Sequence, residues 1–225
     1  VLREKGPPVV MAILTGVVGQ VTDRIRKIHV QIDKRIATMG APRQAPGGGG
    51  RRVFPEADGL IPQPYRGAVD LDVVSTLAGF SAADKEILKT VSRTLLFPPG
   101  ALLCREGDPG DSCFIVAGGE VELYKQVAGE TRLLTTLSSC LLGQMALVDP
   151  SPRSATLRTR TEVVVLELVR DAFQQLLGEH SPCALRFQDM LAVTGIRQLR
   201  EATVRLAGLG DVPQTVRPPE PRKPP

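Results

Sequence analysis

Short apolar segments separated by closely spaced turns fill the middle of this 225-residue chain. Between residues 93 and 126, turns rich in glycine, proline and aspartate interrupt the apolar segments at 98–100, 106–111 and 117–119. Turns that recur about every eight to twelve residues are typical of antiparallel strands in a barrel or jelly roll. Residues 154–160 and 162–169 predict two further strands, the second rich enough in Val and Leu to be buried on both faces. We therefore expect a mainly β fold with flanking helices, built on an antiparallel β jelly-roll barrel.

A candidate anion site lies between the predicted strands, at residues 143–156. Gly143 permits close approach of a ligand to the backbone, and residues 144–147 can form one helical turn whose N–H groups point at an anion. Arg153 offers a planar guanidinium that matches two phosphate oxygens, and the amides near residues 154 and 155 can complete the site. The alternative is a plain strand–turn–strand crossing with a solvated arginine. The candidate ligand-binding residues are Gly143, Gln144, Met145, Ala146, Arg153, Ser154 and Ala155.

Several motifs in a fixed order give residues 70–208 a wider resemblance. They are the 71–88 segment, the Pro99–Gly100 turn, the Glu106–Asp108 turn, the apolar 114–123 strand, residues 143–156, and the 165–168 strand followed by residues 173–177. Together these motifs resemble a cyclic nucleotide-binding domain. The resemblance implies that cAMP or cGMP is the regulatory ligand. It also implies that Gly143 and Gln144 meet the ribose and phosphate, that Arg153 with residues 154–155 binds the cyclic phosphate, and that the helix after the barrel closes over the base.

Two departures from the family pattern leave a second interpretation open. Gln144 stands where the family usually has a glutamate that accepts a hydrogen bond from the ribose hydroxyl. An amide oxygen can accept the same bond but without the strengthening that a charge gives. The segment 137–142, just before Gly143, is about one residue shorter than the family's Gly-Asp turn. A domain that binds no nucleotide and serves as a scaffold or docking subunit of a larger assembly is therefore the alternative to a regulatory or adaptor protein that senses cAMP or cGMP.

The first 39 residues predict an amphipathic helix. Residues 9–19 form an apolar run too short for the roughly 20 residues of a membrane-spanning helix. Apolar residues then recur at threes and fours, at Val18, Val21, Ile25, Ile28, Ile32, Ile36 and Met39. This stripe can fold back on its own domain, associate with a second copy or dock on another protein. Because no Trp or Phe anchors the apolar face, binding to a membrane surface is the least favoured alternative.

Residues 40–70 are rich in Gly and Pro and predict a linker, so we expect the helix at 1–39 to be tethered and to contact another protein or a second copy through residues 9–39. The domain proper is expected at 71–208, with a capped helix beginning after Ser81. A long final helix, 182–207, can act both as the lid and as a homodimer contact. Residues 209–225 form a Pro-rich tail that is too short to add a DNA-binding module.

The composition argues against nucleic-acid binding, metal binding and catalysis. The formal charge of +4 is mild, and basic and aromatic residues do not gather in the pattern that single-stranded nucleic acids require. The four cysteines show no C-x-x-C spacing, so we expect no metal site and free thiols in a cytoplasmic protein. No pairing of Ser or Cys with His suggests a nucleophilic site, and we therefore expect no enzymatic activity.

Overall fold

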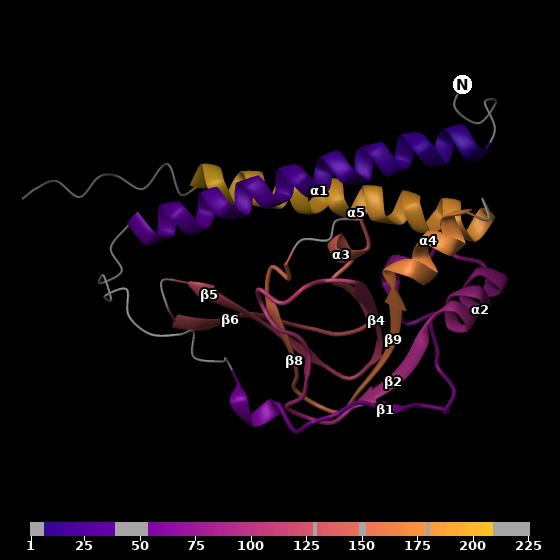
Figure 1. Ribbon diagram of the computed structural model, residues 1–225, viewed down its shortest axis with the longest axis horizontal. Helices are drawn as coiled ribbons and strands as arrows, with labels where there is room; N and C mark the ends of the chain where they lie inside the picture. Colours follow the sequence, from indigo (N-terminus) through magenta and orange to yellow (C-terminus); the bar gives the residue numbers. More distant parts are fainter. Residues whose placement is uncertain (1–6, 39–53, 128–129, 149–151, 179–180, 209–225) are drawn as a thin grey trace, which may run out of the picture.

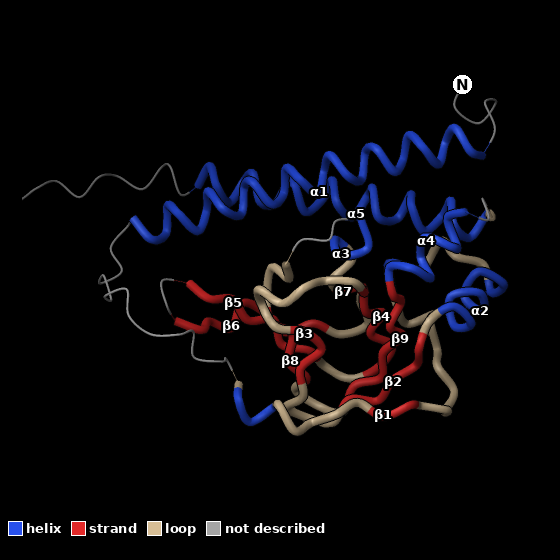
Figure 2. Tube along the Cα trace, viewed as in Figure 1, coloured by secondary structure: helices blue, strands red, loops and turns tan. Residues whose placement is uncertain are grey.

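The computed structural model describes residues 7–38, 54–127, 130–148, 152–178 and 181–208. Two antiparallel sheets form the body of the molecule, and the long helices lie together on one side of it (Figure 1, Figure 2). The strands are β1 (Gln63–Pro64), β2 (Arg93–Phe97), β3 (Leu102–Cys104), β4 (Ser112–Gly118), β5 (Val121–Val127), β6 (Glu130–Leu137), β7 (Leu141–Leu142), β8 (Thr156–Thr159) and β9 (Val163–Val169). The helices are α1 (Pro7–Thr38), α2 (Ala82–Val91), α3 (Met145–Val148), α4 (Arg170–Gly178) and α5 (Pro182–Gly208), with short 3-10 turns at Pro55–Ala57 and Ser75–Leu77.

The strands pair in two separate sheets. One sheet has the order β1-β2-β9-β4-β7 and the other the order β3-β8-β5-β6. No strand pairing within the described residues joins the two sheets, so they do not form a closed barrel; the antiparallel pairing expected from the sequence is confirmed, and the jelly-roll arrangement stays a prediction. The chain passes from one sheet to the other between β4 and β5, at Gly119. A side chain there would collide with the carbonyl oxygen of Glu162, so the close crossing requires glycine.

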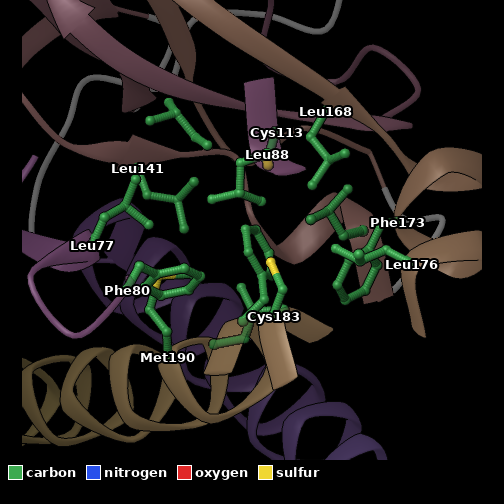
Figure 3. Close-up of a cluster of buried hydrophobic side chains, with 14 of the residues drawn as sticks. Leu77, Phe80, Leu88, Cys113, Leu141, Leu168, Phe173, Leu176, Cys183 and Met190 are labelled. Atoms are coloured by element: carbon green, nitrogen blue, oxygen red, sulfur yellow. The ribbon is translucent and has the colours of Figure 1, made fainter. Parts of the chain in front are cut away.

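Two hydrophobic clusters lie on opposite faces of the five-stranded sheet. Strand β9 serves both: Val163 and Val165 belong to the cluster between the sheets, and Leu166 and Leu168 to the cluster under the helices. Figure 3 shows the second cluster, where side chains from β4, β9, α2, α4 and α5 meet. The near-continuous Val and Leu sequence of β9 therefore reflects burial on both faces, as the sequence predicts.

Helix α2 begins with a capping box that also binds a distant helix. The Ser81 hydroxyl accepts a hydrogen bond from the Asp84 amide, and the Ser81 amide donates to the Asp84 carboxylate at 2.7 Å. Arg186 of α5 donates to both oxygens of the same carboxylate, at 2.9 and 2.7 Å. Burial alone would raise the pKa of Asp84, but the bonds from Ser81 and Arg186 outweigh it and lower this pKa from 3.8.

Helix α1 packs along α5 of the same chain, and the two helices run in the same direction (Figure 1). Val18, Ile25 and Ile32 are buried at every seventh position of α1, the spacing of a helix–helix seam. Thr15 accepts a hydrogen bond from Gln188 at 2.6 Å, and Val21 lies against Gly195. Of the interpretations left open by the sequence, the structure shows the helix folded back on its own domain.

The burial of the two long helices differs along their length. On α5, Ala192 is buried in the cluster under the helices, but Ile196 and Thr203 are exposed, because α1 covers a neighbouring face. On α1, the side chain of Ile36 and the whole of Met39 lie outside the described residues. The seam with α1 occupies part of the surface that a homodimer through residues 182–207 would use.

Part of the predicted linker belongs to the folded body. In the 54–70 segment, β1 pairs with β2, and the Phe54 ring packs against Tyr124 with ring centroids 4.8 Å apart. The rest of the predicted linker, residues 40–53, and the predicted tail at 209–225 lie outside the described residues. Within the part of the chain that is described, no helix combines the length and apolarity needed to cross a membrane.

Candidate functional site

A cavity of about 340 Å³ lies between residues 143–146, residues 152–154, strand β5 and helix α1. This volume is at the lower end of the range of roughly 300–1,000 Å³ that small-molecule sites occupy. Its lining includes three cationic side chains and one carboxylate among the described residues, so positive charge dominates. The lining residues are Arg26, His29, Val30, Glu106, Gly107, Lys125, Gly143, Met145, Ala146, Pro152, Arg153 and Ser154.

Residues 143–148 form the turn that the sequence predicts. Gly143 has φ of +72°, a backbone conformation that glycine adopts without strain, and it directs the chain from β7 into the single turn of α3. The amide of Ala146 donates to the Gly143 carbonyl at 3.0 Å, and the amide of Leu147 donates to the Gln144 carbonyl at 3.2 Å. These two amides are therefore used within the turn, which leaves fewer donors for an anion than the sequence suggests.

Arg153 is buried beside the cavity rather than solvated. Its Nη1 atom donates to the Ser112 carbonyl at 2.6 Å and its Nη2 atom to the Ser112 hydroxyl at 3.0 Å. The guanidinium also lies over the Phe114 ring, 5.5 Å from the ring centroid. Nε is buried and has no hydrogen-bond partner among the described residues. A buried cation with an unused donor at a cavity wall is suited to an anionic ligand.

Gly110 and Gly143 leave space for the side chain of Arg153. A Cβ atom on Gly143 would lie 2.8 Å from Arg153 Nη1, and a Cβ atom on Gly110 would lie 3.3 Å from Arg153 Nε. Both distances are shorter than ordinary contacts. The position of the Arg153 side chain therefore depends on glycine at both residues.

The turn at residues 105–108 fixes the backbone of Arg153. The Gly107 amide donates to the Arg153 carbonyl at 2.9 Å, and the Arg153 amide donates to the Asp108 carbonyl at 2.8 Å. Glu106 accepts a bond from Lys125 of β5 at 3.3 Å, and Lys125 also donates to the Ser154 carbonyl at 3.1 Å. The 105–108 turn, strand β5 and the segment around Arg153 are thus held as one unit.

Arg170, at the start of α4, holds the α3 turn from the other side. Its guanidinium donates to the carbonyls of Ala146 and Gly110. Its own amide donates to the Asp111 carbonyl at 2.6 Å. These bonds join α3 directly to the first turn of α4.

Cys113 follows Ser112 on β4 and is fully buried in the cluster under the helices. Burial raises the pKa of the Cys113 thiol to about 12, so the sulfur stays protonated and unreactive in the folded chain. No disulfide joins the four cysteines, all of which lie in described segments. The same segments contain no cluster of three or more His, Cys, Asp or Glu residues able to hold a metal ion.

The structure brings most of the predicted site residues together. Gly143, Met145, Ala146, Arg153 and Ser154 line the cavity. Gln144 is buried but does not line it, and Ala155 is half-buried and outside it, with its carbonyl facing the Cys104 thiol at 3.8 Å. Whether the lining residues bind a ligand remains a prediction.

The sequence interpretation missed the contribution of α1 to this cavity. Arg26, His29 and Val30 line it, whereas α5, the expected lid, supplies none of the lining residues. The i, i+3, i+4 spacing of these residues places them on one face of a helix, but spacing alone does not say which surface that face covers. Lys125 and Pro152 were also missed: Lys125 comes close to Arg153 only through tertiary structure, whereas Pro152 directly precedes it in the sequence.

The family model described as "Cyclic nucleotide-binding domain" matches residues 94–180, a range that includes Arg153 and the residues around it. Residues 94–180 of the chain are thus similar to this domain family over most of the two-sheet body. The matched range covers the strands from β2 to β9 and helix α4, and helices α1 and α5 lie outside it. The predicted family is therefore confirmed for the two-sheet body.

Named relatives of this cyclic nucleotide-binding domain are regulators. The chain is 30% identical over 129 residues to a cAMP-dependent protein kinase regulatory subunit of Pyricularia oryzae, covering 57% of this chain and 33% of the relative. It is 29% identical to the CRP-like cAMP-activated global transcriptional regulator of Mycobacterium tuberculosis, covering 65% of this chain and 67% of the regulator. The chain thus spans about a third of the length of the fungal subunit. The structure of Thermus thermophilus catabolite activator protein superposes with a TM-score of 0.54 at 28% identity, covering 60% of this chain and 62% of that protein.

Proposed function

We propose that the chain is a regulatory or adaptor protein that binds cAMP or cGMP in the cavity beside Arg153 and passes the signal to a partner protein. The observation that carries the proposal is the buried side chain of Arg153, which lines a cavity dominated by positive charge and has an unused donor at Nε. The cyclic phosphate would meet Arg153 and the turn at 143–146, and the ribose would lie toward Gly107. The regulatory names of the relatives support a role without catalysis.

A series of contacts connects the cavity to the long helices. Arg170 binds the Ala146 carbonyl, so any shift of the α3 turn on ligand binding changes the position of α4. Helix α4 contacts α5 in turn, and α5 contacts α1. We propose that a partner protein responds to the arrangement of these helices.

Calorimetric titration of the full chain with cAMP and cGMP tests the proposal. In Arg153→Ala the loss of a charge-assisted contact to the phosphate should weaken binding by about 2–4 kcal/mol. Arg153→Lys keeps the charge but loses the planar fork, so its affinity should fall between wild type and Arg153→Ala. Because Arg153 also bonds Ser112, far-ultraviolet circular dichroism should accompany the titration to confirm that each variant is folded.

Arg158→Ala is the matched control. Arg158 is also partly buried and lies over an aromatic ring, that of Phe54, with its guanidinium carbon 4.7 Å from the ring centroid. It does not line the cavity, so this variant should bind nucleotide as wild type does. Equal affinity of wild type and Arg153→Ala, or no binding by wild type, would reject the sensor function.

The second candidate is a nucleotide-free scaffold. The Ser112 carbonyl and hydroxyl already accept bonds from Arg153, and Gln144 lies outside the cavity lining, which favours this candidate. Failure of wild type to bind either nucleotide, combined with recovery of a defined complex partner by the folded chain, would support it.

A further inference from the structure

One turn of α1 closes the side of the cavity that faces away from the sheets. Arg26, His29 and Val30 all line it, and the rest of the lining comes from the 105–108 turn, β5 and residues 143–154. Helix α1 also contacts α3 and β5, the elements on either side of the cavity (Figure 1). Val30 is 47% exposed, so an apolar surface is available to a ligand there.

The seam with α5 fixes this turn over the cavity. Ile25 and Ile32 are buried, and Arg26, His29 and Val30 lie between them in the sequence. At about 100° per residue, His29 and Arg26 lie on one side of the seam, roughly 40° and 100° from Ile25, and Val30 lies farther round the same side, at roughly 140°. The burial of Ile25 therefore positions Arg26 and His29 at the cavity.

We propose that α1 is the lid of the nucleotide site and that Arg26, His29 and Val30 meet the purine base. This inference rests on the proposed function, because Arg153 at the wall formed by residues 143–154 must take the phosphate. Val30 offers apolar contact to the face of the base, and Arg26 offers donors to its edge. The segment that precedes the domain, rather than the helix that follows it, then determines the choice of base.

The guanidinium of Arg26 favours guanine over adenine. Guanine presents two adjacent acceptors, O6 and N7, which match the paired donors of a guanidinium, whereas adenine presents a donor and an acceptor at the corresponding edge. Loss of the Arg26 guanidinium should therefore weaken cGMP binding more than cAMP binding.

The test compares three ligands on the full-length chain: cAMP, cGMP and ribose 3′,5′-cyclic phosphate, which has no base. Arg26→Ala should weaken cGMP about fivefold to tenfold and cAMP by a smaller factor, the size expected for one lost hydrogen bond to a charged group. Val30→Ala should weaken both nucleotides about threefold through lost apolar contact. Neither change should alter the affinity for the compound without a base.

Arg24→Ala is the matched control, because Arg24 is an exposed arginine on the same helix that does not line the cavity. It should bind all three ligands as wild type does. If wild type and Arg24→Ala bind nucleotide through Arg153 while Arg26→Ala and Val30→Ala bind equally well, the lid is refuted and the proposed function stands. If the α1 variants also weaken the compound without a base, α1 does not read the base. If wild type binds no ligand, both the function and the lid are refuted.

Discussion

Arg153 occupies space that glycine positions leave open, and this makes the site sensitive to a single methyl group. The amide and carbonyl of Arg153 are fixed by Gly107 and Asp108, so the side chain has one route toward Ser112. That route passes within 2.8 Å of where a Cβ atom on Gly143 would lie. The position of the guanidinium therefore depends on Gly143 as much as on its own hydrogen bonds.

We predict that Gly143→Ala both destabilises the chain and weakens nucleotide binding. Its φ of +72° is unfavourable for alanine by about 1–2 kcal/mol, and the new methyl group would displace Arg153 Nη1. Gly100→Ala provides the control, because Gly100 has φ of +84° but its Cβ would meet its nearest neighbours at an ordinary 3.5 Å. Chemical denaturation and titration of both variants check the prediction. Equal loss of affinity in the two variants would contradict it, since only Gly143→Ala should disturb Arg153.

At the scale of elements, the capped start of α2 is joined to α5 by one carboxylate. Asp84 accepts from the Ser81 amide and from Arg186, and these bonds keep its pKa below 3.8. A carboxyl group whose pKa is lowered by folding stabilises the folded state above its unfolded pKa, and this contribution is lost as the pH falls through the folded value.

We predict that Asp84→Asn lowers the free energy of unfolding at pH 7 by about 1–2 kcal/mol, because the bond to Arg186 is lost. The loss is no larger because Arg186 is partly solvated, so water screens its charge. The difference between wild type and variant should persist down to about pH 4 and diminish at lower pH, as Asp84 becomes protonated in the wild type. Urea unfolding of both proteins between pH 3 and 7 measures it. Asp72→Asn is the control, because the ion pair of Asp72 with Lys85 is exposed on the Asp72 side. A constant difference between wild type and Asp84→Asn across this range would contradict the assignment.

The elements that could be predicted from the sequence are those with strong local signals. The capping box at Ser81, the doubly buried β9 and the α3 turn after Gly143 all follow from local patterns and are present. Whether the strands close into a barrel could not be predicted, because turn spacing is the same whether the final strands close a barrel or leave two edges. The contribution of α1 to the cavity was equally hidden, since an amphipathic stripe shows that a helix is covered without showing by what.

For the whole molecule, the α1–α5 seam joins the helix that precedes the two-sheet body in the sequence to the helix that follows it. Its contacts pair Thr15 with Gln188 and Val21 with Gly195, positions that are 173 and 174 residues apart. The nearly constant separation means that the helices run parallel and in register. Parallel helices in register normally come from two copies of one sequence, and here the second helix is supplied by the same chain.

We predict that Gly195→Leu separates this seam. A Cβ atom on Gly195 would already lie 3.0 Å from Val21 Cγ1, so a larger side chain must displace α1 and should reduce the free energy of unfolding by about 1–3 kcal/mol. Val193→Leu, at an exposed position two residues earlier, should have little effect. Guanidinium denaturation followed by circular dichroism compares the two. Unchanged stability in Gly195→Leu would mean that α1 does not press against α5 in solution.

The buried thiol of Cys113 lies one residue from the group that holds Arg153. Its sulfur is covered by the helices that pack on the five-stranded sheet, and its raised pKa of about 12 suppresses the reactive thiolate. A thiol reagent can therefore modify Cys113 only when local unfolding exposes this cluster. The modification rate of Cys113 thus measures how often the packing next to Ser112 opens, whether or not a ligand is present.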